Sequence, residues 1–165
     1  MNSAKTRILF ICHGNICRSP MAEYIFKHLS RERGVAEMFE VASAAVSTEE
    51  TGNDIYPPAK RKLREHGIPF EHHSAHRITR AEYEQYDYIL CADQTNIQRL
   101  EWIVGDTEKA SLMMEWTDGH IVNGEIINGK KVNISDPWYT GDFEQAYQDI
   151  YTSCQAILRQ LTGRI

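Results

Sequence analysis

The apolar positions of the chain follow two periods, one typical of buried strands and one typical of helices. Residues 8–12, ILFIC, form an unbroken apolar run that predicts a buried strand. Apolar residues at helical spacing follow and predict a helix over residues 20–33. Ser19 and Pro20 fit the N-cap and the first position of this helix. The chain therefore opens with a strand, a short loop and a helix.

Strand-like and helix-like segments continue to alternate along the rest of the chain, without repeats or an obvious linker. Further strands are predicted over residues 38–46, 86–93 and 110–116. Further helices are predicted over residues 57–67, from a capping box at 79–82, over 94–104 and over 143–161. This alternation predicts one α/β domain over residues 1–165, in which a parallel sheet carries helices on both faces. Ligands of such sheets bind beyond the carboxyl ends of the strands, where the loop after Cys12 lies.

One segment departs from this alternation. Residues 118–135 contain two Asn-Gly pairs, which begin at Asn123 and Asn128 and are flanked by β-branched residues. Asn-Gly in this setting is a strong hairpin signal, so we predict an inserted β-hairpin near 118–135. Its position directly before residues 135–147 would let it steer partners toward a site built on that segment.

Composition and charge narrow the possible functions. The chain has 165 residues, 42% hydrophobic and 25% charged, as is usual for one globular domain. Its net charge of −5 argues against a broad nucleic-acid or anionic-membrane surface, so an anion site must be local. The apolar run at 8–12 is too short for a signal-peptide core, and no later stretch is long enough to span a membrane. Four cysteines without a secretion signal predict reduced thiols and a cytoplasmic protein.

The loop after the first strand combines a cysteine with groups that bind an anion. A loop that enters a helix presents free backbone N–H groups and the positive end of the helix dipole. Beside these groups and Arg18, Cys12 is expected to be a thiolate at neutral pH. The planar guanidinium of Arg18 fits two oxygens of a tetrahedral oxyanion. Gly14 permits close backbone approach, Asn15 tolerates left-handed geometry, and Ser19 is placed to donate a hydrogen bond to the thiolate.

These features resemble the low-molecular-weight protein tyrosine phosphatase family. The segment CHGNICRSPMAE has the cysteine, five residues and arginine of a phosphate loop, and a DPW motif follows late in the chain. The resemblance continues through SAAVS at 43–47, KLREHGI at 62–68, YDYILCAD at 86–93 and SDPWYTGDFEQAY at 135–147. It implies a three-layer fold with a four-stranded parallel sheet, a phosphocysteine intermediate and no metal or other cofactor. The implied partners are phosphotyrosine-containing proteins, and the chain is expected to be a monomer or weak dimer.

Carried over residue by residue, the resemblance implies three catalytic residues. Cys12 is the nucleophile, Arg18 clamps the phosphate, and Asp136 is the general acid and then the general base. The residues implied to bind the substrate phosphate are His13, Gly14, Asn15, Ile16, Cys17 and Ser19. Supporting roles fall to Ser43, His73 and Asp93. Cys17 is also implied to form a reversible disulfide with Cys12 under oxidation.

The wall of the implied pocket is where the sequence departs from the family pattern. Trp138 and Tyr139 are expected to face the substrate. Glu49 stands in the wall where many members carry tryptophan, and His13 replaces the more usual apolar or threonine neighbour of the nucleophile. His76 occupies a position where arginine is common. Substrate preference is therefore the property that the resemblance specifies least.

Other functions remain open. A thiol-dependent arsenate reductase would use the same loop, but it needs further cysteines in a mobile segment, and Cys91 and Cys154 fit buried positions instead. A non-catalytic phosphoprotein-binding module would keep Arg18 and lose Cys12 or the acid, yet this chain has both. A metal site at the two loop cysteines lacks the usual ligand spacing. Ile16 matches the tyrosine-type loop, whereas the phosphoarginine branch has threonine there, and this favours an aryl phosphate.

Overall fold

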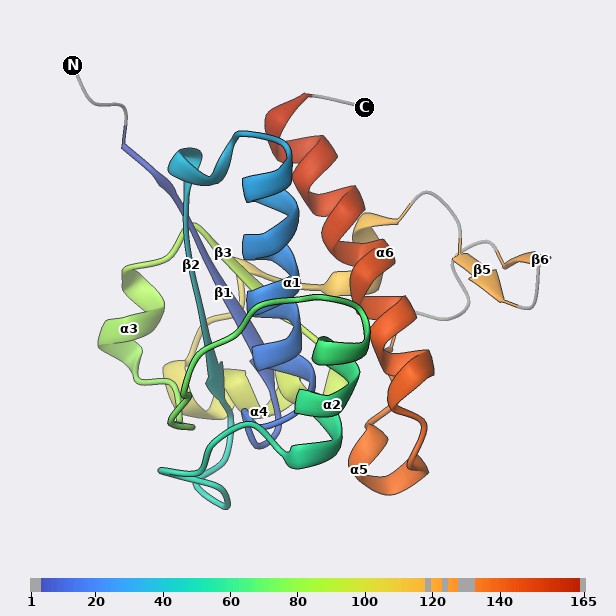
Figure 1. The fold of residues 1–165 in the computed structure, drawn as a ribbon. Coiled ribbons are helices and arrows are strands. Elements are labelled where there is room, and N and C mark those ends of the chain that lie inside the picture. The colour runs from blue at the N-terminus through green and yellow to red at the C-terminus, as the bar shows by residue number, and fades with distance from the viewer. Residues whose placement is uncertain (1–3, 118–119, 123–124, 128–132, 164–165) are drawn as a thin grey trace.

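A four-stranded parallel sheet with strand order β2-β1-β3-β4 forms the centre of the protein (Figure 1). The computed structural model describes residues 4–117, 120–122, 125–127 and 133–163. The strands of the sheet span Thr6–Cys12 (β1), Phe39–Ala45 (β2), Tyr88–Cys91 (β3) and Ala110–Leu112 (β4). The predicted parallel α/β fold is confirmed, and β1 lies inside the sheet.

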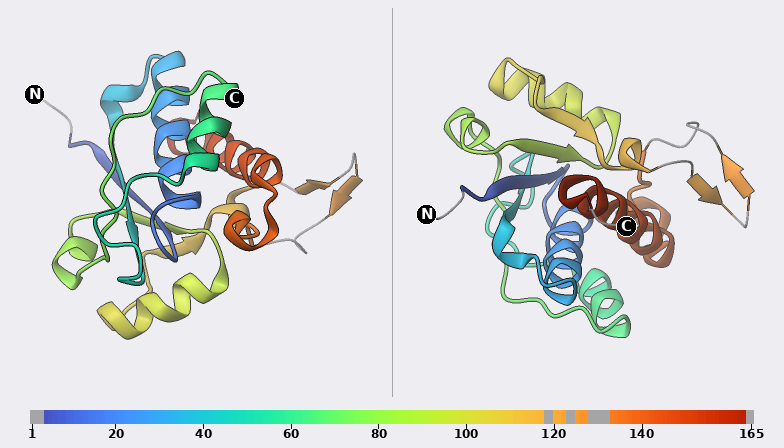
Figure 2. Two further views of the ribbon diagram at one scale, coloured as in Figure 1. Left: turned by 60° about the horizontal axis from the view of Figure 1, so that its bottom comes forward. Right: turned by 90° about the horizontal axis from the view of Figure 1, so that it is seen from above.

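Helices cover both faces of the sheet, so the fold has three layers (Figure 2). Helices α1, α2 and α6 lie on one side, and α3 and α4 lie on the other (Figures 1 and 2). The helices span Arg18–Glu32 (α1), Pro57–Glu65 (α2), Arg80–Glu84 (α3), Gln94–Val104 (α4), Pro137–Thr140 (α5) and Phe143–Thr162 (α6). Two 3-10 turns span Ala36–Met38 (η1) and Met113–Trp116 (η2). Within the described residues, none of the helices has the length and apolar character that a membrane crossing requires.

Strand β1 is buried on both faces, which explains its unbroken apolar run. Ile8 and Phe10 belong to the core shared with α1 and α6, whereas Leu9 and Ile11 belong to the core shared with α4. All four side chains are fully buried. Successive side chains of a strand point to opposite faces, so a strand between two helix layers needs an apolar residue at every position. This packing fixes Cys12, the last residue of β1, at the carboxyl edge of the sheet.

The fourth strand is shorter than predicted. It ends at Leu112, and the residues predicted to continue it form the 3-10 turn η2. Met113 and Met114 of this turn are buried in the core shared with α6. An apolar run alone does not distinguish a strand from a buried turn, and this is why the prediction of a strand up to residue 116 was wrong.

Two predicted helix caps also differ from the structure. The N-cap of α1 is Cys17 rather than Ser19, which lies inside the helix and uses its hydroxyl in the preceding loop. Thr79 accepts the backbone N–H of Glu82 at the start of α3, as half of a capping box requires. The carboxylate of Glu82 instead contacts His76 at 2.8 Å. Partners in the preceding loops therefore take the side chains of Ser19 and Glu82 away from their predicted capping bonds.

The segment predicted as a hairpin contains two short strands that pair antiparallel. They span His120–Val122 (β5) and Glu125–Ile127 (β6). The pair projects from the body of the molecule beside α6 (Figures 1 and 2). The Asn-Gly pairs at Asn123 and Asn128 lie outside the described residues, so the turns of the predicted hairpin stay a prediction.

Candidate active site

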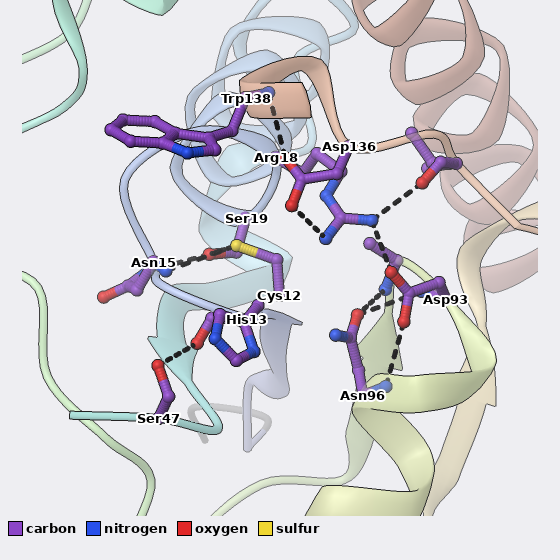
Figure 3. A network of polar contacts seen from close by, with 12 residues as sticks. Cys12, His13, Asn15, Arg18, Ser19, Ser47, Asp93, Asn96, Asp136 and Trp138 are labelled. Carbon is purple, nitrogen blue, oxygen red and sulfur yellow. Dashed lines mark hydrogen bonds and ion pairs between the residues drawn. The ribbon is translucent and has the colours of Figure 1, made fainter. Parts of the chain in front are cut away.

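The loop between β1 and α1 surrounds the sulfur of Cys12. This residue is only 3% exposed. Its Sγ lies 3.0 Å from the Oγ of Ser19 and accepts the backbone N–H of Asn15 at an N···S distance of 3.3 Å (Figure 3). Ser19 lies in the first turn of α1, so the sulfur of Cys12 lies beside the N-terminus of this helix.

Asn15 holds this loop in its conformation. Its φ of 61° lies in the left-handed region, and the residue is fully buried. Its Nδ2 donates to the hydroxyls of Ser19 at 2.8 Å and Ser43 at 3.0 Å, and its Oδ1 accepts the backbone N–H of His76 at 3.2 Å. Its carbonyl oxygen accepts a hydrogen bond from Nε2 of His73 at 2.7 Å. Together these contacts stabilise a backbone conformation that residues other than glycine seldom adopt.

Glu23 extends this network, although its role was not predicted from the sequence. Its Oε1 accepts the hydroxyl proton of Ser43 at 2.7 Å, and its Oε2 accepts a hydrogen bond from Lys27 at 2.6 Å. Because Nδ2 of Asn15 only donates, the hydroxyl of Ser43 accepts a hydrogen bond from Asn15 and donates its own O–H to Glu23. The hydroxyl of Ser19 likewise accepts a hydrogen bond from Asn15 and has its O–H left to donate to the sulfur of Cys12. The sequence signal that could have indicated this role is the position of Glu23, one helical turn after Ser19 and between Ala22 and Tyr24.

Arg18 is the cation of the site and is only 2% exposed. Its Nη1 donates to Oδ2 of Asp93 and to the carbonyl oxygen of Ile134, both at 2.7 Å. Its Nη2 lies 3.4 Å from Oδ2 of Asp136 (Figure 3). Burial by itself lowers the pKa of this guanidinium, but the negative charges of Cys12, Asp136 and Asp93 outweigh burial and raise it. The site therefore holds a fixed cation whose longest contact is the one with Asp136.

Asp93 and Asp136 each cap a helix while contacting Arg18. Asp93 is the N-cap of α4, and its Oδ1 accepts a backbone N–H of the first turn at 2.9 Å. Asp136 is the N-cap of α5, and its Oδ1 accepts the backbone N–H of Trp138 at 3.1 Å. The N–H of Ile134 donates to a carbonyl just after β3 at 2.9 Å and so ties the segment before α5 to the sheet. Backbone donors therefore hold both carboxylates against the guanidinium.

A pocket of about 60 Å³ opens beside the loop. Its walls come from the loop after β1, the segment after β2, and α5. The lining residues are His13, Gly14, Ile16, Cys17, Glu49, Glu50, Asp136, Trp138 and Tyr139. Seven of the predicted site residues do not line it: Cys12, Asn15, Arg18, Ser19, Ser43, His73 and Asp93. Of the lining residues, Glu50 was not predicted from the sequence, because no motif marks it.

The other cysteines differ from Cys12 in their surroundings. All four are free thiols. Burial, reinforced by the charges of Cys12 and Asp136, raises the pKa of the Cys17 thiol well above its usual range. Burial also raises the pKa of Cys91 and Cys154, which are fully buried as expected. These three thiols are therefore poor nucleophiles at neutral pH. The reversible disulfide between Cys12 and Cys17 stays a prediction.

Comparisons with known proteins cover nearly the whole chain. Residues 7–164 match the model of the family described as low molecular weight phosphotyrosine protein phosphatase. The human protein of that name is 36% identical over 159 residues, which cover 95% of this chain and 96% of the relative. The low molecular weight protein-tyrosine-phosphatase YfkJ of Bacillus subtilis is 31% identical over 156 residues, which cover 93% and 94%.

Solved structures show the same fold. The crystal structure of YfkJ from Bacillus subtilis matches with a TM-score of 0.89 at 29% identity, covering 99% of this chain and 98% of that one. The crystal structure of DARP, a drosophila arginine phosphatase, matches with a TM-score of 0.80 at 28% identity, covering 93% and 96%. Because the family model and these relatives span almost all of the sequence, the chain belongs to the low molecular weight phosphotyrosine protein phosphatase family.

Proposed function

We propose that this protein hydrolyses phosphotyrosine in proteins through a phosphocysteine intermediate. One observation carries the proposal: the sulfur of Cys12 lies at a helix N-terminus, in the loop whose Arg18 contacts Asp136. A nucleophile, a cation and an acid therefore meet beside one pocket. Relatives named as phosphotyrosine protein phosphatases support this choice of substrate.

In the first step, the thiolate of Cys12 attacks the phosphorus of the substrate. The S–P bond forms as the bond from phosphorus to the phenol oxygen breaks, and Asp136 gives its proton to that oxygen. Arg18 and the N–H groups of the loop stabilise the charge on the remaining phosphate oxygens. The hydroxyl of Ser19, 3.0 Å from the sulfur, stabilises the thiolate before the attack.

In the second step, water hydrolyses the intermediate. The oxygen of the water attacks phosphorus while the carboxylate of Asp136 accepts a proton from the water, and the S–P bond breaks. Inorganic phosphate leaves, and the thiolate of Cys12 is restored. The same carboxyl group is therefore an acid in one step and a base in the next, and each cycle returns it to its starting state.

Phosphoarginine is the alternative substrate, because the chain is similar in structure to an arginine phosphatase. The pocket favours an aromatic ring. Ile16 supplies a buried apolar side chain to its lining, and Trp138 and Tyr139 supply aromatic side chains that are 49% and 82% exposed. A phenyl ring packs against the apolar side chain of Ile16, which offers no partner to the charge of a guanidinium, and it can also stack on the two aromatic rings. Rates measured on both phosphorylated amino acids separate the two candidates.

We further propose that residues 1–165 form one domain, which acts in the cytoplasm as a monomer or weak dimer. The two cores described above support a single domain, because both are built on β1. No cofactor enters the proposed mechanism. Among the described residues, one cluster has the composition of a metal site, and none of its members, Glu65, His66 and Glu144, lines the pocket.

Hydrolysis of p-nitrophenyl phosphate without added metal tests the proposed function. We expect steady turnover that a chelator leaves unchanged, because Cys12 supplies the nucleophile and Arg18 the positive charge. The measurement is the release of p-nitrophenol with and without EDTA. Activity that disappears with EDTA and returns with a divalent cation would show that the mechanism is wrong.

A further inference from the structure

Glu49 gives the pocket wall a negative charge that the proposed chemistry does not use. Its Oε2 accepts a hydrogen bond from Nε2 of His13 at 3.0 Å. The side chain of Glu49 is nevertheless 68% exposed, and that of His13 is 26% exposed. The carboxylate is therefore held at the pocket by one partner and stays open to a second one.

The backbone that carries Glu49 is fixed to the catalytic loop. The hydroxyl of Ser47 donates to the carbonyl oxygen of His13 at 2.9 Å. The N–H of Val46 donates to the carbonyl oxygen of Cys12 at 3.2 Å. In Figure 3, Ser47 and Trp138 lie on opposite sides of Cys12. The segment after β2 and helix α5 thus form facing walls of the pocket, and Glu49 belongs to the first of them.

A second carboxylate makes the same wall more acidic. Glu50 accepts a hydrogen bond from the side chain of Asn53 at 2.7 Å and packs against Gly14, where an added Cβ would lie 3.2 Å from Cγ of Glu50. No lysine or arginine is among the described residues that line the pocket. Like charges repel, so this wall disfavours a phosphate dianion that brings no positive charge of its own.

We propose that Glu49 determines substrate specificity by selecting phosphotyrosine segments that carry a lysine or arginine beside the phosphotyrosine. This inference rests on the proposed function and names the class of substrate for that site. A neighbouring cation would pair with the exposed carboxylate and offset its repulsion of the phosphate. The exposed aromatic rings of Trp138 and Tyr139, on the facing wall, offer the same cation a cation–π contact.

The test compares two phosphotyrosine peptides that differ only in a lysine or a glutamate next to the phosphotyrosine. Dissociation constants are measured by calorimetry in a Cys12→Ser background, which separates recognition from turnover, and kcat/KM is measured in the protein with Cys12. We expect the lysine peptide to be favoured about 3- to 10-fold at low salt, and less at high salt. Glu49→Gln should reduce this ratio, and Glu49→Lys should reverse it.

Glu37→Lys is the matched control, because it makes the same change in net charge on an exposed residue of η1, away from the pocket lining. It should leave the peptide ratio unchanged. Equal binding of both peptides to the protein with Glu49, or the same ratio after Glu49→Lys, would overturn the inference even if phosphotyrosine is hydrolysed. Absence of turnover on any aryl phosphate would instead overturn the proposed function, while the binding ratio would still decide the role of Glu49.

Discussion

Replacement of Cys12 by serine is expected to lower turnover by more than about 10³-fold, as the loss of a catalytic nucleophile does. A serine hydroxyl is not ionised at neutral pH and needs an adjacent base. Among the described residues, the groups that hydrogen-bond the sulfur of Cys12 are the hydroxyl of Ser19 and the N–H of Asn15, and neither acts as a base. Binding of phosphotyrosine should survive, because Arg18 and the loop N–H groups remain. Stopped-flow kinetics and calorimetry measure the two properties separately.

Cys154→Ala is the matched control for this experiment. It also removes a buried thiol, but from α6, where the sulfur contacts the carbonyl oxygen of Ala22 rather than the catalytic loop. This variant should keep its turnover once its folding has been verified by circular dichroism. Turnover of Cys12→Ser within tenfold of the unmodified protein would show that Cys12 is not the nucleophile.

Replacement of Asp136 by asparagine is expected to slow the hydrolysis of phosphotyrosine by roughly 10² to 10⁴, the usual contribution of general acid catalysis. Asparagine is also a good N-cap, so the bond to the N–H of Trp138 and the start of α5 should be retained. The loss should shrink as the leaving group of the substrate becomes more acidic, because such a phenolate needs no proton. Values of kcat/KM for a series of aryl phosphates measure this trend, because kcat/KM reports the first step alone and is not affected by slow hydrolysis of the intermediate.

Asp142→Asn provides the comparison that isolates chemistry from capping. Asp142 is the N-cap of the next helix, α6, where its Oδ1 accepts the N–H of Gln145 at 2.9 Å. It does not line the pocket, and its substitution should leave the whole series of rates unchanged. An equal loss for every leaving group in Asp136→Asn would mean that Asp136 is structural, and the acid would have to be another residue.

The fold was predictable from the sequence wherever burial alone sets the pattern. The apolar run of β1 reflects its burial between two cores, and the helical spacing of α6 reflects one buried face. Both elements form where they were predicted. Prediction failed where a side chain has its partners outside its own helix. Ser19 is a good N-cap by residue type, but Asn15 and Cys12 engage its hydroxyl from the preceding loop. Capping rules that consider only the residue type at each helix position do not include such contacts.

The candidate site shows the same division. The loop from Cys12 to Arg18 is a local motif, so its residues were predicted together. Glu23 and Glu50 were missed because their roles depend on contacts with Ser43 and Gly14, which lie on other segments of the chain. The hydrogen bond from Arg18 to the carbonyl oxygen of Ile134, before α5, was also not predictable from the sequence. These contacts arise only when the carboxyl ends of the parallel strands meet at one edge of the sheet.

Formation of phosphocysteine at Cys12 is the central claim, and its most direct test is to trap that intermediate. Asp136→Asn should make it accumulate, because this variant lacks the base for the second step, while an aryl phosphate with an acidic leaving group still allows the first step. The protein is mixed with this substrate, denatured rapidly, and mapped by mass spectrometry. We predict one phosphoryl group per chain, on the sulfur of Cys12. A phosphoryl group on another residue, or product release with no phosphorylated protein at any time, would contradict the mechanism.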